Sequence, residues 1–123
     1  MGKTVLCVDD ERAGLEVRKM LLEHHGYSVL IAESGAEGLA LFQAHPVDGV
    51  VLDYLMPGMT GDEVAAQMKT LKPRVPIVML SAYYQLPEQA LKHVDAFVVK
   101  GDTPLVLLGR LGQLVGVQPS AAS

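Results

Sequence analysis

Short apolar runs alternate along the chain with segments in which apolar residues recur every three to four positions. Apolar runs of this length are typical of buried strands, and the second spacing is that of one face of a helix. Strands are expected at residues 5–8, 27–32, 47–52, 76–80 and 97–99. The run at 47–52 is apolar on both faces, which favours a central place in a parallel sheet.

Helices are expected after each strand. Gly26 and His45-Pro46 end the first two, a Thr60–Glu63 capping box opens the third, and Thr103-Pro104 opens a last helix that runs to about Val115. Residues 87–92 form only a short and poorly defined helical segment. The positions expected to face the core are Ala13, Val17, Met20 and Leu21 in the first helix, Ala36, Leu39 and Ala40 in the second, and Val64, Met68 and Leu71 in the third.

Five strands that alternate with five helices predict an α/β fold of the doubly wound type. Each parallel strand needs a crossover that packs on a face of the sheet, so the result is a three-layer sandwich with a five-stranded parallel sheet. The length of 123 residues fits one domain. We expect this domain to span residues 1–117 and residues 118–123 to form a flexible C-terminal tail.

Charge and cysteine content narrow the classes of function. The formal net charge of −4 lacks the basicity that favours nucleic acid or an anionic membrane. The single cysteine, Cys7, lies inside an apolar run, which excludes an internal disulfide framework and predicts a buried side chain. No apolar run reaches membrane-spanning length and no signal peptide is evident, so we expect a cytoplasmic protein.

Chemically distinctive side chains follow the predicted strands. Asp9 and Asp10 follow the first strand, Asp53 the third, Ser81 the fourth and Lys100 the fifth. Because ligands bind at the carboxyl ends of the strands in such sheets, we expect these groups to converge. Three clustered carboxylates repel one another unless a cation sits among them, and Mg²⁺ prefers such oxygen ligands.

An aspartate among these groups can act as a nucleophile. A carboxylate attacks phosphorus to form an aspartyl phosphate when the approaching negative charges are neutralised. In this interpretation the metal bridges Asp53 and the phosphoryl group, Lys100 contacts one phosphoryl oxygen, and the Ser81 hydroxyl donates to another.

Four segments together resemble the receiver domain of two-component response regulators, of the single-domain chemotaxis type. They are residues 8–11 (VDDE), 52–61 (LDYLMPGMTG), 80–82 (LSA) and 97–100 (FVVK). The resemblance implies a flavodoxin-like (βα)5 fold with strand order 2-1-3-4-5. It also implies roles for the site residues: Asp53 as phosphoacceptor, Asp9, Asp10, Asp53 and the Leu55 carbonyl as Mg²⁺ ligands, Ser81 as switch hydroxyl, Lys100 as phosphate contact and Phe97 as rotating aromatic.

The resemblance also implies partners. A sensor histidine kinase or phosphotransfer protein would supply the phosphoryl group from a phosphohistidine, and a downstream protein would bind the face made by residues 87–92, strand 97–99 and the last helix. That helix is apolar almost all round, which makes a homodimer an alternative use of its surface. We expect that the protein is not an enzyme acting on a separate substrate, although the domain would promote its own Mg²⁺-dependent phosphorylation and dephosphorylation.

Two departures from the family pattern keep an alternative open. Receivers commonly have proline after the lysine, often in a cis peptide, whereas Gly101 stands here and makes a cis bond very unfavourable. The segment between Ser81 and Lys100 is also short. A receiver-like interaction module that does not use phosphorylation is therefore the alternative. A phosphatase of the haloacid dehalogenase type is disfavoured because Leu55 stands where its second aspartate would be.

Overall fold

The central element is a five-stranded, fully parallel sheet in the order β2-β1-β3-β4-β5. The computed structural model describes residues 2–116. The strands are β1 (Thr4–Val8), β2 (Ser28–Ala32), β3 (Gly49–Asp53), β4 (Ile77–Ser81) and β5 (Ala96–Val99). The predicted fold class and strand order are both confirmed.

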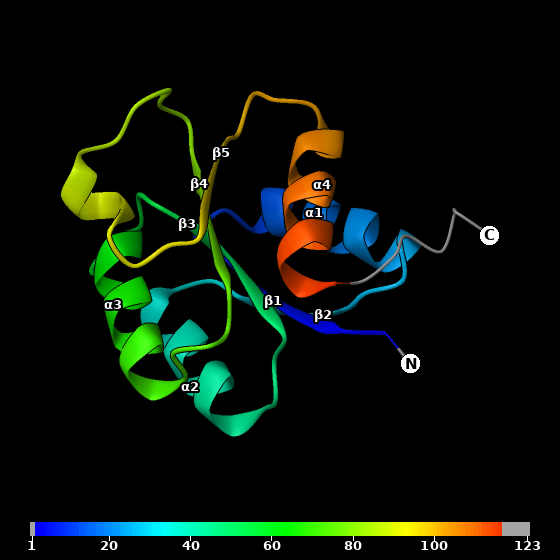
Figure 1. The fold of residues 1–123 in the computed structure, drawn as a ribbon, viewed down its shortest axis with the longest axis horizontal. Coiled ribbons are helices and arrows are strands. Elements are labelled where there is room, and N and C mark those ends of the chain that lie inside the picture. Colours follow the sequence, from blue (N-terminus) through cyan, green and yellow to red (C-terminus); the bar gives the residue numbers. More distant parts are fainter. Residues whose placement is uncertain (1, 117–123) are drawn as a thin grey trace.

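Helices cover both faces of this sheet (Figure 1). They are α1 (Arg12–His24), α2 (Gly35–Ala44), α3 (Gly61–Leu71) and α4 (Pro104–Val115), with a 3-10 turn, η1 (Glu88–Leu91), between β4 and β5. The helices α1 and α4 lie on one face, and α2 and α3 lie on the other. The result is the expected three-layer sandwich.

Alternate side chains of the strands build the two halves of the core. On one face Leu6, Val50 and Met79 pack against Phe42 of α2 and Met68 of α3. On the other face the buried strand residues pack against α1 and α4, and they include Cys7, which is fully buried as predicted. Burial raises the pKa of the Cys7 thiol to about 12.

The apolar stripe predicted for α1 was wrong at three of its four positions, since Leu21 packs against the core but Ala13, Val17 and Met20 are exposed. Val17 and Met20 are 68% and 69% exposed, and Leu15 and Leu22 are the buried residues of this helix. The helix carries two overlapping apolar stripes, and periodicity alone does not decide which one faces the sheet.

Smaller errors of the same kind affect the next two helices. In α2, Ala36 and Ala40 are exposed whereas Phe42 is fully buried. In α3, Val64 and Met68 are buried as expected, but Leu71 at the end of the helix is 45% exposed. The end of α3 therefore extends beyond the core at Leu71.

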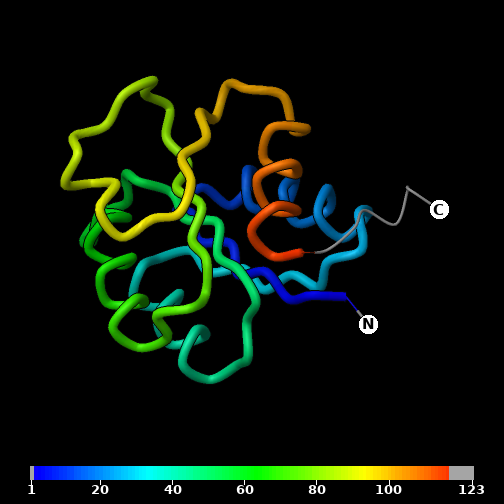
Figure 2. The backbone as a smooth tube through the Cα atoms, viewed as in Figure 1, coloured from blue at the N-terminus to red at the C-terminus, as the bar shows by residue number. Residues whose placement is uncertain are grey.

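The connection between β4 and β5 contains one 3-10 turn of four residues instead of a full crossover helix (Figure 2). This agrees with the short helical segment expected at 87–92. No peptide bond among residues 2–116 is cis, so Lys100 and Gly101 are joined by a trans bond. The tail predicted at residues 118–123, and residue 117, lie outside the described residues.

Candidate phosphoryl-transfer site

The predicted site residues meet at the carboxyl edge of the sheet. Asp9 directly follows β1, Asp53 ends β3 and Ser81 ends β4, while Lys100 directly follows β5. Carboxylate oxygens of Asp9, Asp10 and Asp53 lie within 4.8 Å of one another. The structure therefore brings together the residues whose convergence the sequence predicted.

The loop after β3 is held close to the end of the strand. The Tyr54 N–H donates to the Leu80 carbonyl at 2.9 Å, and the Gly61 N–H donates to the Tyr54 carbonyl at 2.7 Å. A Cβ at Gly61 would overlap the Asp53 carbonyl oxygen, so only glycine fits this close approach. Gly58, with φ of 86°, makes the turn that returns the chain to α3.

Asp9 is a buried carboxylate with a partner for each oxygen. Its Oδ1 accepts from the Glu11 N–H at 3.0 Å. Its Oδ2 lies 3.1 Å from Lys100 Nζ and 3.4 Å from the Arg18 guanidinium. Burial acts to raise the pKa of Asp9, but the Glu11 N–H and the two cations outweigh it, and the pKa is lowered.

Asp53 is held by one cation and repelled by its neighbours. Lys100 Nζ lies 2.9 Å from Asp53 Oδ1. Burial nevertheless raises the pKa of Asp53, and the charges of Asp9 and Asp10 add to the rise, which Lys100 only partly offsets. The pKa of Lys100 is raised because its contacts with Asp53 and Asp9 outweigh the opposing effect of burial.

A cavity of about 220 Å³ opens above these side chains. Its lining includes the three aspartates, Ser81, Lys100 and Leu55. The Ser81 hydroxyl oxygen accepts from the Tyr83 N–H at 3.0 Å, which leaves its own proton free to be donated. Phe97, in β5, is half-buried against the α2–α3 side of the core rather than part of this lining.

Sequence reasoning missed Arg18. Its side chain is 14% exposed and forms an ion pair with Asp9. Once Leu15 and Leu22 are known to be the buried residues of α1, Arg18 is seen to share their face, since it lies three residues after Leu15 and four before Leu22. A cation on the buried face of α1 required a buried anion, and Asp9 is that anion.

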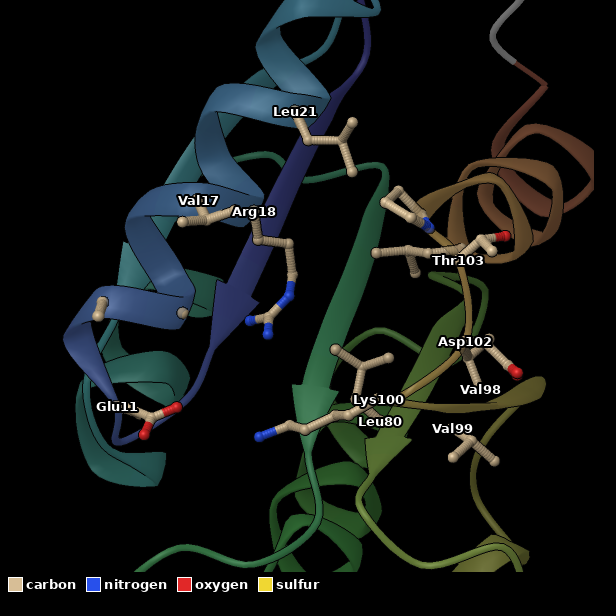
Figure 3. A pocket seen from close by; sticks show the side chains of 14 residues that line it. Glu11, Val17, Arg18, Leu21, Leu80, Val98, Val99, Lys100, Asp102 and Thr103 are labelled. Atoms are coloured by element: carbon tan, nitrogen blue, oxygen red, sulfur yellow. The ribbon is translucent and has the colours of Figure 1, made fainter.

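A second cavity, of about 460 Å³, lies between α1 and α4 and is called here the α1–α4 groove. Gly14, Val17 and Leu21 line it from α1, and Pro104 and Leu107 line it from α4. Arg18 and Lys100 extend into the space between its two walls (Figure 3). The groove therefore adjoins the acidic cluster through these two cations.

The family model for the response regulator receiver domain matches residues 5–107. The chain belongs to this family. Over 89 residues it is 39% identical to the response regulator MprA from Mycobacterium sp. strain KMS, an alignment that covers 72% of this chain and 39% of MprA. This receiver domain thus spans less than half the length of that relative.

Solved structures show the same fold. The response regulator TrrA of Thermotoga maritima in complex with Mg²⁺ and BeF is 34% identical, with a TM-score of 0.87 over 91% of this receiver domain and 98% of that chain. TrrA in complex with the histidine kinase ThkA matches with a TM-score of 0.85 at 34% identity, over 92% of this domain and 98% of that chain.

The acidic cluster of this receiver domain fits a hard divalent cation. It offers carboxylate oxygens from three residues at close range, and Asp10 is exposed at the mouth of the cavity. Among residues 2–116, no helix has the length and apolar character needed to cross a bilayer.

Proposed function

We propose that this receiver domain accepts a phosphoryl group on Asp53 from the phosphohistidine of a sensor histidine kinase or phosphotransfer protein. The supporting observation is the contact of 2.9 Å between Asp53 and Lys100 inside a cavity that also holds Asp9, Asp10 and Ser81. An Asp53 oxygen would form a bond to phosphorus while the donor's phosphorus–nitrogen bond breaks, and the electron pair would leave with the imidazole.

The proposed metal is Mg²⁺, held by Asp9, Asp10, Asp53 and the Leu55 carbonyl. A bound Mg²⁺ supplies positive charge that offsets the repulsion between the carboxylates and the incoming phosphoryl oxygens. Lys100 would turn from Asp9 and Asp53 toward a phosphoryl oxygen. The buried Ser81 hydroxyl would donate its proton to another oxygen of the same group.

The switch proposed for this site links Ser81 to Phe97. A phosphoryl group adds about −1.5 to −2 charge and three acceptor oxygens, which would draw the Ser81 side chain inward. The half-buried Phe97 would then rotate into the vacated space and change the surface of η1, β5 and α4. That surface is our proposed contact for a downstream protein.

Exposed apolar residues support a partner surface on α4. Leu105 is 73% exposed, and Val106 and Leu114 are partly exposed on the same helix. A downstream protein or a second copy of the chain would cover these residues. Three further expectations stay predictions. They are that the domain binds no nucleic acid, that it acts in the cytoplasm, and that the domain ends at residue 117 with a tail at residues 118–123.

The test is incubation with acetyl phosphate and Mg²⁺, followed by intact mass measurement. We expect one phosphoryl adduct on the wild type and none on Asp53→Asn. Asp62→Asn, which removes a carboxylate at the start of α3 outside the cavity, is the matched control and should be modified like the wild type. Chelation of Mg²⁺ should abolish the adduct.

Two results would contradict the proposal. An adduct on Asp53→Asn would place the phosphoryl group on another residue. An unmodified wild-type protein, with both acetyl phosphate and a phosphorylated kinase as donor, would favour the alternative of an interaction module that does not use phosphorylation.

A further inference from the structure

Two cations converge on a single oxygen of Asp9. Lys100 Nζ lies 3.1 Å from Asp9 Oδ2, and the Arg18 guanidinium lies 3.4 Å from the same atom. The Asp9 side chain is only 1% exposed, so these two cations are the main balance for its charge. The other oxygen, Oδ1, is engaged by the Glu11 N–H.

The position of Arg18 follows from the geometry of α1. Side chains of a helix tilt toward its N-terminus, so a long residue placed nine positions after Asp9 reaches back toward the end of β1. Gly14, one turn before Arg18, lies beside this path. A Cβ at Gly14 would lie 3.7 Å from the Arg18 guanidinium, an ordinary van der Waals contact. The aliphatic part of Arg18 meanwhile lines the α1–α4 groove (Figure 3).

The two cations have different second contacts. Lys100 also binds Asp53 at 2.9 Å, so its charge is shared between two carboxylates. The ion pair with Asp9 is the contact that the structure gives Arg18. Within the cluster, Arg18 and Lys100 together offset two of the three carboxylate charges, and a dication that enters the cavity meets a site that is already largely neutralised.

We propose that Arg18 is a built-in competitor of Mg²⁺: its charge stabilises the acidic cluster without metal and weakens the affinity of the cluster for the metal. This inference rests on the proposed Mg²⁺ site. Arg18 is a positioning residue, since it acts through Asp9 and does not line the cavity above Asp53. When the metal enters, the guanidinium must share Asp9 Oδ2 with it or withdraw toward the α1–α4 groove.

The test compares Mg²⁺ affinity, measured by titration calorimetry on metal-free protein without a phosphoryl donor. Arg18→Met keeps an apolar chain of similar length but removes the charge, and Arg18→Gln removes the charge while keeping polar hydrogen-bond donors. Arg18→Lys restores a charge at the same position. Lys19→Met is the matched control because Lys19 pairs with Glu23 at 3.1 Å, away from the cluster.

We expect both neutral variants to bind Mg²⁺ roughly ten-fold more tightly than the wild type, the effect of removing one nearby charge from a partly buried site. Arg18→Lys and Lys19→Met should stay within about three-fold of the wild type, since neither removes charge from the cluster. A second readout is the melting temperature. In chelator, Arg18→Met should melt below the wild type, and saturating Mg²⁺ should raise its melting temperature by more than that of the wild type.

The results separate failure of this inference from failure of the proposed function. Equal or weaker Mg²⁺ binding by both neutral variants, with a wild type that binds the metal, would overturn the role of Arg18 and leave the proposed function standing. Absence of Mg²⁺ binding by the wild type would overturn the proposed metal site itself. A merely structural role would lower the melting temperature equally with and without metal.

Discussion

Lys100 and Asp53 form an ion pair of 2.9 Å although Asp53 ends β3 and Lys100 directly follows β5. The contact depends on the parallel pairing of β3 with β4 and of β4 with β5, which brings both strand ends to one edge. The same ammonium group lies 3.1 Å from Asp9. Lys100 is therefore the counter-charge that two buried carboxylates share.

Removal of this counter-charge should destabilise the metal-free domain. We expect Lys100→Met to lower the free energy of unfolding by about 1 to 2 kcal/mol in chelator, less than for a fully buried pair because the lysine side chain is 28% exposed. Mg²⁺ should recover part of the loss. Urea denaturation measures the unfolding free energy in chelator and in Mg²⁺. Lys92→Met, at an exposed lysine, serves as the control. A Lys100→Met protein as stable as the control would contradict this account.

The raised pKa of Asp53 predicts a stabilising substitution. Burial and the neighbouring carboxylates make the ionised form of Asp53 costlier in the folded than in the unfolded chain. Asp53→Asn should therefore raise the melting temperature of metal-free protein at pH values above the raised pKa. This advantage should disappear as the pH falls to the ordinary value of 3.8, where the wild-type carboxyl is increasingly protonated in both states.

Substitution of Asp9 by asparagine should have the opposite effect on the melting temperature of metal-free protein, measured over the same pH range. Its pKa is lowered, so its ionised form stabilises the fold above the ordinary value, and this contribution is lost as the pH falls through the lowered pKa. Asp9→Asn should be less stable than the wild type near neutral pH and approach it in acid. The same sign for both variants would show that the electrostatic assignment is wrong.

Gly61 and Gly109 offer a test of the loop that holds Asp53. A Cβ at Gly61 would overlap the Asp53 carbonyl oxygen and approach Met79 Sδ to 2.9 Å, so Gly61→Ala should cost about 1 to 3 kcal/mol of unfolding free energy. Gly109, in the interior of α4, has open space around the same position, and Gly109→Ala should stabilise by about 0.5 to 1 kcal/mol. Urea denaturation measures the unfolding free energy of both variants. Changes of the same sign would contradict the close approach of Gly61 to the Asp53 carbonyl.

Ser81 should matter for the rate of phosphorylation more than for the fold. Ser81→Ala loses the acceptor for the Tyr83 N–H, which lies close to the surface and can bond to water instead. If the hydroxyl donates to the phosphoryl group, the alanine variant should react with acetyl phosphate roughly ten-fold or more slowly, and Ser81→Thr should react faster than Ser81→Ala. Time courses of intact mass measure the rates. A phosphorylation rate of Ser81→Ala equal to that of the wild type would contradict the proposed hydrogen bond from Ser81 to the phosphoryl group.

The placement of the candidate site could be predicted from the sequence because it follows from topology. Once five parallel strands are inferred, residues that follow the strands must share one edge of the sheet, and Asp9, Asp53 and Lys100 are found there. Strand pairing is fixed by backbone hydrogen bonds and short crossovers. The spacing of the apolar runs along the sequence indicates the strands and the short connections between them.

The side-chain environment of α1 could not be read in the same way. Val17 and Met20 fit a helical stripe as well as Leu15 and Leu22 do, and the choice between the stripes depends on how the helix is rotated against the sheet. Arg18 lies on the buried face because Asp9 compensates its charge. That compensation is a contact between distant positions, which the local pattern of apolar residues does not contain.

The four-residue turn η1 has a consequence for how this domain communicates. So short a turn contributes few internal hydrogen bonds, so the stretch that joins Ser81 to Lys100 draws its shape mainly from its neighbours, among them α3, and not from a helix of its own. In this receiver domain we expect the proposed output surface to be more easily reshaped at η1 than a surface built on a longer crossover helix.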